Sequence, residues 1–213
     1  MPYAGVLFDF DGTLVDTTDL VIESFQYTLR PYLGREVKPE EVYPFFGAPL
    51  REGLFAFVPD KAEELLPVYR RYTNEHFEEK IKLCPGVREG LGRLKKAGLK
   101  LGVVTSRMRK TTLRGLEIFD LLHFFVTVVA LEDVDNHKPG PEPVRKALRD
   151  LGVAAEDAIM IGDSPLDILA ARAAGVKSAA AGWSAVPRAR LLAAEPDFSV
   201  ESMEEFVEIC LAG

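Results

Sequence analysis

Five short apolar runs recur along the chain, and each has the length of a buried β-strand. They are Ala4–Phe8, Leu101–Val104, Phe124–Val129, Ala158–Ile161 and Val176–Ala180. Continuous apolar runs of this length are typical of strands that are covered on both faces of a parallel sheet. The pattern therefore predicts a mainly parallel sheet that contains these five strands.

Stretches with helical periodicity separate the runs, as crossover helices between parallel strands do. They include Val87–Ala97, Pro141–Leu151 and Pro165–Ala174. Glycines follow them at positions 98, 152 and 175, where left-handed helix caps favour glycine. This alternation predicts an α/β fold, a doubly wound Rossmann-like sheet whose ligands bind beyond the carboxyl ends of the strands.

One block, from Thr17 to Lys82, breaks the alternation, because it shows helical periodicity and no convincing buried strand. Its apolar positions are Val21, Ile22, Phe25, Leu29 and later Leu65, Tyr69, Tyr72, His76. We interpret residues 17–82 as a small helical cap, inserted into an α/β core formed by residues 1–16 and 83–213. Asp16–Thr18 and Leu83–Gly86 suit hinges, and the first of these is expected to cap a helix. Such a cap can close over a ligand and exclude water.

Composition and charge limit the function classes. The 213 residues are 47% hydrophobic and 28% charged, as in an ordinary soluble globular protein. The net charge of -7 comes without any long basic run, which argues against nucleic acid or an anionic membrane as a partner. Two distant cysteines, Cys84 and Cys210, and the lack of a signal-peptide pattern favour the cytoplasm. A monomer and a homodimer are both compatible with the sequence.

Polar residues stand where the predicted strands end. Asp9 and Asp11 follow the first strand, Thr105 and Ser106 the second, and Asp163 the fourth. Lys138 lies in the loop after the third run. Because parallel strands end at one edge of a sheet, we expect these side chains to meet there.

The residue types match the requirements of phosphoryl transfer, which needs a nucleophile, an acid, a cation and donors around the phosphoryl oxygens. Asp9 is expected to attack and form an aspartyl-phosphate, which water then hydrolyses. Asp11 is expected to be the acid and then the base, and Gly12 to allow close approach of the backbone. The Thr105 hydroxyl and the Ser106 N–H are expected to bind phosphoryl oxygens.

Magnesium is the expected cofactor, since neighbouring carboxylates repel each other unless a cation or a proton lies between them. The predicted Mg²⁺ ligands are Asp9, Asp163 and a backbone carbonyl, most plausibly that of Asp11. The Asp11 side chain is then expected to be free to hold a proton. Lys138 is expected to bind phosphate and to position Asp9.

These residues resemble the motifs of the haloacid dehalogenase superfamily, in order and across nearly the whole chain. The motifs are Asp9-Phe10-Asp11-Gly12-Thr13-Leu14, Thr105, Lys138 and Gly162-Asp163 with Asp167. The resemblance implies a nucleophilic Asp9, an acid/base Asp11, phosphate ligands Thr105 and Lys138, and an Mg²⁺ ligand Asp163. It implies a supporting role for Asp167, although Ser164-Pro165-Leu166-Asp167 also reads as a helix start.

Within the superfamily the chain is similar to bacterial phosphoglycolate phosphatases and to the related inorganic pyrophosphatase. Pro44–Leu50 and Lys138–Val144 carry this similarity. It implies a small phosphorylated substrate, such as 2-phosphoglycolate or pyrophosphate. In the insert, Gly47 and Arg51 are expected to meet the distal end of that substrate.

Two other functions are compatible with the same motifs. A phosphosugar mutase uses the same first step, but its cap should offer several polar contacts to a sugar. A non-catalytic phosphate- or metal-binding module would not need an acid two residues from a ligand, so the pair Asp9 and Asp11 argues against it.

Overall fold

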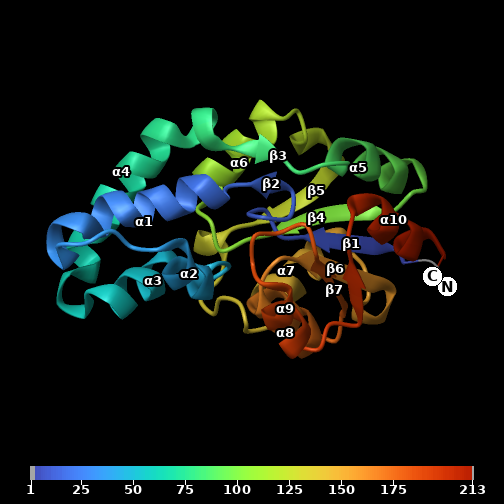
Figure 1. Ribbon diagram of the computed structural model, residues 1–213. Helices are drawn as coiled ribbons and strands as arrows, with labels where there is room; N and C mark the ends of the chain where they lie inside the picture. Colours follow the sequence, from blue (N-terminus) through green and yellow to red (C-terminus); the bar gives the residue numbers. More distant parts are fainter. Residues whose placement is uncertain (1–2, 213) are drawn as a thin grey trace.

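A six-stranded parallel sheet forms the centre of the computed structural model, which describes residues 3–212 (Figure 1). The order in the sheet is β5-β4-β1-β6-β7-β8, and every neighbouring pair is parallel. The strands are β1 (Gly5–Phe8), β4 (Lys100–Val104), β5 (Phe125–Val129), β6 (Ala158–Gly162), β7 (Lys177–Ala181) and β8 (Phe198–Val200). The predicted doubly wound α/β fold is confirmed.

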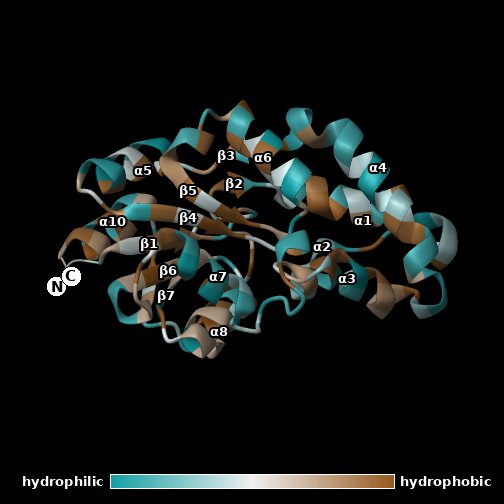
Figure 2. Cartoon of the chain, turned by 180° about the vertical axis from the view of Figure 1, so that it is seen from behind, coloured by the Kyte–Doolittle hydropathy of each residue, from teal (hydrophilic) through white to brown (hydrophobic). Residues whose placement is uncertain are grey.

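Both faces of the sheet are covered, because alternate strand residues enter two separate hydrophobic clusters. Val6 and Phe8 of β1 pack in one cluster, and Leu7 packs in the other. Helices α5 (Val87–Lys96), α6 (Arg109–Ile118) and α10 (Met203–Ala212) cover the first face, whereas α7 (Glu142–Leu151) and α8 (Pro165–Ala174) cover the second. Figure 2 shows the strands as the hydrophobic centre of this layered core. The continuous apolar runs of the sequence result from burial on both sides.

Four α-helices and two short 3₁₀ turns fill the predicted insert and lie together at one end of the molecule (Figure 1). They are α1 (Thr18–Leu33), α2 (Pro39–Val42), α3 (Leu50–Phe57) and α4 (Ala62–Lys80), with 3₁₀ turns at Tyr43–Phe45 and Pro59–Lys61. Phe25, Leu29, Leu54, Leu65 and Tyr69 belong to a hydrophobic cluster of their own. The insert therefore has an apolar interior separate from the two clusters at the sheet.

The predicted apolar stripe of α4 is wrong in its second half. Tyr72 and His76 are half-buried and stack on each other, with ring centroids 4.2 Å apart. Thr73 and Phe77 are the buried residues, and Phe77 packs in the cluster of the core. The buried face turns in this way because α4 leaves the insert and meets the α/β core near its carboxyl end.

A pair of short antiparallel strands connects the insert to the core. In it, β2 (Val15–Asp16) pairs with β3 (Lys82–Leu83), and Val15 lies opposite Leu83. The pair lies at the two predicted hinges. We propose that helices α1–α4 form the predicted cap, residues 17–82, on a core of residues 1–16 and 83–213. Residues 1, 2 and 213 of that core lie outside the described residues.

The strand β8 was not predicted, because its three residues Phe198–Val200 form no apolar run and only Val200 is fully buried. The remaining helix of the core is the short α9 (Arg188–Ala193). The core also contains 3₁₀ turns at Leu122–Phe124, Leu131–Asp133 and Ala155–Asp157. Among the described residues, no helix has both the length and the apolar character needed to cross a bilayer.

Candidate active site

Four predicted site residues meet at the carboxyl edge of the sheet. Asp9 follows β1, Thr105 follows β4, Asp163 follows β6, and Lys138 lies in the loop between β5 and α7. The backbone N–H of Asp9 still donates to the carbonyl of Ile161 at 2.9 Å, and that of Thr105 to Val129 at 2.9 Å. These last backbone hydrogen bonds between neighbouring parallel strands fix the positions of Asp9 and Thr105 at the edge of the sheet.

Lys138 forms a buried ion-pair centre between two carboxylates. Its Nζ lies 2.5 Å from Asp167 Oδ1 and 3.0 Å from Asp9 Oδ1, and all three side chains are at most 2% exposed. Burial opposes the charge of Lys138, but Asp167 and Asp9 outweigh it and raise the pKa of Lys138. The lysine is therefore charged, and it forms an ion pair with Asp9.

Asp167 combines the two roles between which the sequence left a choice. Its Oδ2 accepts hydrogen bonds from the backbone N–H of Ser164 at 3.0 Å and from the Ser164 hydroxyl at 2.7 Å. This arrangement caps the N-terminus of α8. Its Oδ1 holds Lys138. The start of α8 thereby fixes the lysine that lies beside Asp9.

The three carboxylates of Asp9, Asp163 and Asp167 carry more negative charge than one lysine balances. Each offers an oxygen, and these oxygens lie within 4.8 Å of one another. Burial, reinforced by Asp167, raises the pKa of Asp9 to about 7. Burial, reinforced by Asp9, also raises the pKa of Asp163 well above its usual range. A divalent cation would remove this excess charge.

The donor set fits Mg²⁺, which prefers oxygen ligands from one or two carboxylates. Asp9 Oδ1 is buried and has no hydrogen-bond partner among the described residues, since Lys138 approaches it only as an ion-pair partner. Asp167 is already engaged on both oxygens by Lys138 and Ser164. Asp9 and Asp163 are therefore the side chains left for a metal.

Gly12 is the residue that allows the loop after β1 to pass Asp163. Its φ of +69° is in the left-handed region, and a β-carbon there would collide with the Asp163 carboxylate. The Asp163 Oδ2 also accepts a hydrogen bond from the Ser184 hydroxyl at 2.7 Å. Ser184 was not predicted. It orients a carboxylate that the sequence assigned to the metal.

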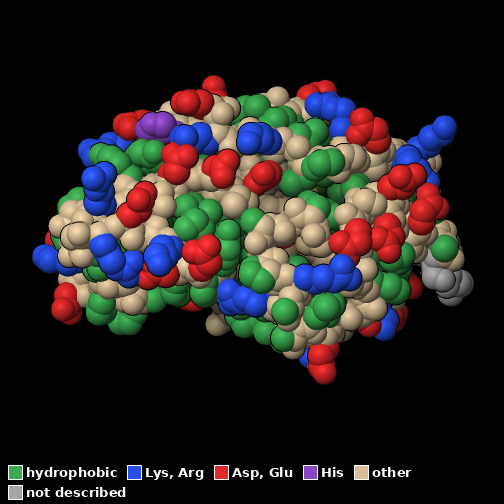
Figure 3. Space-filling view, viewed as in Figure 1, with side chains coloured by type: hydrophobic (Ala, Val, Ile, Leu, Met, Phe, Trp, Pro, Cys, Tyr) green, Lys and Arg blue, Asp and Glu red, His purple; other side chains and the backbone are tan. Residues whose placement is uncertain are grey.

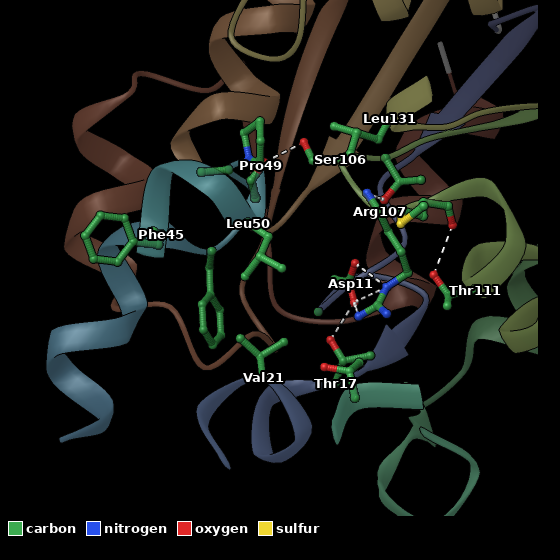
Figure 4. Close-up of a pocket in the computed structure, with 18 of the residues that line it drawn as sticks. Asp11, Thr17, Val21, Phe45, Pro49, Leu50, Ser106, Arg107, Thr111 and Leu131 are labelled. Carbon is green, nitrogen blue, oxygen red and sulfur yellow. Dashed lines mark hydrogen bonds and ion pairs between the residues drawn. The ribbon is translucent and has the colours of Figure 1, made fainter. Parts of the chain in front are cut away.

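The Asp11 side chain is bound by Arg107 and Thr17, two contacts that the sequence did not predict. Arg107 donates to it from Nε, at 3.0 Å to each oxygen, and from Nη2, at 2.6 Å to Oδ1 (Figure 4). The Thr17 hydroxyl donates to Oδ1 at 2.7 Å. Both contacts suit a carboxylate, the form in which Asp11 accepts a proton.

Thr17 was expected only to cap a helix, but Asp16 makes that contact. The Thr18 N–H donates to Asp16 Oδ1 at 3.0 Å. The Thr17 side chain makes no capping hydrogen bond and binds Asp11 instead. The first residues of the insert therefore contribute directly to the arrangement of the site.

Thr105 and Ser106 lie where the sequence places them, beside the space in front of Asp9. The Thr105 hydroxyl accepts a hydrogen bond from the Arg107 N–H at 3.1 Å, so its own proton remains available to a ligand. The Ser106 hydroxyl donates to the Gly47 carbonyl at 2.7 Å. This bond joins the core to the insert.

Gly47 is one of the points at which the insert touches the core. Its φ is +81°, and a β-carbon at this position would collide with the Ser164 hydroxyl. The neighbouring Phe46 packs against a core cluster that includes Ile168 and Leu191. Gly47 lines the space in front of Asp9, as predicted, but its evident role is close contact between the two parts.

A cavity of about 290 Å³ lies between the insert and the carboxyl edge of the sheet. Its core wall includes Asp9, Asp11, Thr105, Arg107 and Asp163. Its wall on the insert is largely apolar, with Val21, Phe25, Phe45, Phe46, Pro49 and Leu50. Figure 4 shows labelled residues of both walls facing the same space. The nucleophile thus opens into a partly open cavity of the size of a small ligand.

Arg51 lies elsewhere. It does not line this cavity, its side chain is 64% exposed, and it pairs with Glu63 on the outer surface of the insert. The helix α3 turns Leu50 toward the cavity and Arg51 away from it. On the face shown in Figure 3, such acidic and basic side chains are interspersed over insert and core.

Sequence reasoning did not identify Arg107, Thr17 or Ser184 as site residues. Arg107 follows the Thr105-Ser106 pair by one residue, so its place at a strand end was a usable signal. Thr17 and Ser184 offered no comparable signal, because the loops that carry them reach the site only through the tertiary fold.

This arrangement of strand-end residues belongs to a defined class of proteins. The sequence matches the haloacid dehalogenase-like hydrolase family over residues 6–181. The chain therefore belongs to this family and is a hydrolase, as its motifs predict.

Its relatives match it over nearly the whole length. The pyrophosphatase PpaX of Bacillus cereus is 41% identical over 204 residues, which cover 96% of this chain and 94% of the relative. A PpaX of Caldanaerobacter subterraneus is 46% identical over 209 residues, 98% and 95% of the two chains. A haloacid dehalogenase-like hydrolase of Streptococcus pneumoniae has a similar structure, with a TM-score of 0.85, 27% identity and 97% coverage of both chains.

Proposed function

We propose that the protein is a Mg²⁺-dependent phosphohydrolase that cleaves a small phosphorylated metabolite through a phosphorylated Asp9. The observation that supports this most strongly is the buried group formed by Asp9, Asp163 and Lys138 at the end of β1. A carboxylate without a hydrogen-bond partner on Oδ1 faces a lysine on one side and opens to a cavity on the other.

The first half of the reaction forms a bond between an Asp9 carboxylate oxygen and phosphorus. The bond from phosphorus to the leaving oxygen breaks, and Asp11, which enters this step protonated and leaves it as a carboxylate, supplies the proton that this oxygen needs. Lys138 and the Thr105 hydroxyl offer positive charge and a donor to the phosphoryl oxygens. Asp9 and Asp163 would hold the divalent cation, which would supply positive charge to the phosphoryl group and the carboxylates.

In the second half, water attacks phosphorus, and the bond between phosphorus and Asp9 breaks. Asp11, held as a carboxylate by Arg107 and Thr17, accepts the proton of that water. Free phosphate and the original Asp9 carboxylate result. Splitting the hydrolysis in this way replaces one very slow step by two easier ones.

Inorganic pyrophosphate is the first substrate to test, because relatives of this length and identity carry the name pyrophosphatase. 2-Phosphoglycolate is the second, from the resemblance in the motifs. A mutase is the second candidate function, because the insert presents polar side chains such as Arg70 and Asn74 to the cavity beside the apolar Phe45 and Leu50. Isomerisation of a hexose phosphate faster than release of phosphate would favour it.

Phosphate release from both compounds and from p-nitrophenyl phosphate, with Mg²⁺ or with EDTA, tests the proposal. We expect turnover that requires Mg²⁺. Equal rates in EDTA would contradict the cation requirement. Binding of Mg²⁺ and phosphate compounds without turnover of any of them would favour a non-catalytic binding module.

A further inference from the structure

Arg107 lies at the junction of core and insert, in the loop between β4 and α6. Its side chain is only 11% exposed, and it lines the cavity in front of Asp9. The guanidinium carbon lies 5.8 Å from the ring centre of Phe10 and 5.2 Å from that of Phe77. One ring comes from the core and the other from the insert. Both stabilise a cation and hold the guanidinium in place.

The guanidinium uses only part of its hydrogen-bonding capacity. Nε and Nη2 donate to Asp11, whereas Nη1 makes no hydrogen bond among the described residues. A guanidinium is a rigid planar fork, so it can hold one carboxylate on one edge and a second anion on the other. The free edge of Arg107 is therefore available to a ligand in the cavity.

An anionic ligand needs such a donor here, because the site is rich in negative charge. Asp9, Asp11 and Asp163 line the cavity, and the chain carries a net charge of -7. Lys138 is already shared by two carboxylates. The other cations that line the cavity, Arg70 and Lys110, are exposed at its rim. Besides Lys138, Arg107 is the sheltered cation beside the reacting groups in the described part of the chain.

We propose that Arg107 is a substrate-binding residue that selects phosphate esters and anhydrides whose leaving group carries a second negative charge. This inference rests on the proposed function of the same site. Nη1 binds the distal carboxylate or phosphate while Nε and Nη2 remain on Asp11. Because one planar group holds both partners, the leaving oxygen is brought next to the residue that protonates it.

Two matched pairs of substrates test this selection. Pyrophosphate is compared with p-nitrophenyl phosphate, and 2-phosphoglycolate with 2-hydroxyethyl phosphate. Within each pair the leaving groups have similar acidity, provided that pyrophosphate reacts in its monoprotonated form and expels hydrogen phosphate. Only the first compound of each pair carries the second charged group. The selectivity is the ratio of the kcat/KM values of the two compounds in a pair. A loss of acid catalysis or of folded protein lowers both values equally and leaves this ratio unchanged.

We expect Arg107→Met to lower this ratio by about 10- to 100-fold in both pairs, as for a lost hydrogen bond between charged groups. Arg107→Lys should restore part of it, because an ammonium keeps the charge without the fork. Arg114→Met is the matched control. Arg114 lies 5.6 Å from the same Phe77 ring and pairs with Glu78, but it does not line the cavity, so the ratio should stay at the parent value.

An unchanged ratio in Arg107→Met, with all four substrates losing activity equally, would overturn the inference and leave the proposed function standing. A structural role of the Arg107–Asp11 pair would give that result. If the parent protein turned over none of the four substrates with Mg²⁺, the proposed function would fail and this inference with it.

Discussion

The two walls of the cavity differ in chemistry and in how they are fixed. The core wall carries Asp9 and Asp163, which are buried, and Lys138 lies beneath the wall as the ion-pair partner of Asp9. The wall on the insert carries Val21, Phe45 and Leu50, apolar side chains on helices and a loop with their own hydrophobic interior. The core wall is therefore suited to the reaction, whereas the insert and Arg107 are suited to the choice of leaving group.

Asp9→Asn gives the largest effect expected on the core wall. An amide is not a nucleophile, so kcat should fall by about 10⁴-fold or more. The fold should persist, because the substitution removes one charge from a cluster with excess negative charge. Phosphate release and circular dichroism measure the two effects. A folded variant with parent activity would exclude Asp9 as the nucleophile.

Lys138→Met should destabilise the protein by about 3–5 kcal/mol, since it leaves Asp9 and Asp167 as buried carboxylates without their cation. The matched control is Lys146→Met, which removes a pair with Asp150 on the surface of α7. That change should cost no more than about 1 kcal/mol. Urea unfolding of both variants in EDTA gives the comparison. Similar losses of unfolding free energy in the two variants would mean that the buried ion pairs of Lys138 stabilise the protein no more than a surface pair does.

Magnesium should stabilise the protein more at high pH than at low pH. The pKa of Asp9 rises on folding to about 7, so without metal this group contributes stability at acidic pH that is lost as the pH rises through about 7. The cation takes the place of the proton. The increase in Tm on adding Mg²⁺ should therefore be small near pH 5 and larger near pH 8.

Asp163→Asn is the control for the cation, because it removes one of the two carboxylates that we propose bind Mg²⁺. Its Tm should respond little to Mg²⁺ at either pH. Two results would contradict this site for the cation. In the parent protein, Mg²⁺ would raise Tm equally at both pH values; in Asp163→Asn, Mg²⁺ would raise Tm as much as in the parent.

Leu50→Ala gives the smallest effect and tests the wall on the insert. A loss of about 1 kcal/mol of apolar contact corresponds to a rise of about five-fold in KM for an aromatic phosphate such as phenyl phosphate. With pyrophosphate, which has no apolar part, kcat and KM should stay near the parent values. Steady-state kinetics with both substrates measure the difference. A large fall in kcat for both would show that this wall also takes part in the chemistry.

The sequence predicted the core wall well, because its residues sit directly after apolar strand runs. The position of Asp9, Thr105 and Asp163 at one edge follows from parallel strands alone. The structure adds that Asp167 both caps α8 and holds Lys138. That pairing joins the loop of Lys138 to the first turn of α8, 29 residues away in the chain, so no local pattern contains it.

The insert was less predictable, because helical spacing does not say which residues face a neighbouring unit. Phe77 is buried against the core, whereas the adjacent His76 is only half-buried. Helical spacing alone does not distinguish which of these two neighbours belongs to the buried face. Arg51 and Leu50 are adjacent, and only Leu50 faces the cavity. The ion pair of Arg107 with Asp11 depends on the close approach of two loops 96 residues apart in sequence.

The most direct test of the account is to identify the residue that carries phosphate during turnover. The protein would be mixed with pyrophosphate and Mg²⁺, quenched in acid within the first turnovers, digested and mapped by mass spectrometry. The account predicts a phosphoryl group on the peptide that contains Asp9, and none in Asp9→Asn or in EDTA. Turnover with the phosphoryl group on another residue, or with the same adduct in Asp9→Asn, would contradict it.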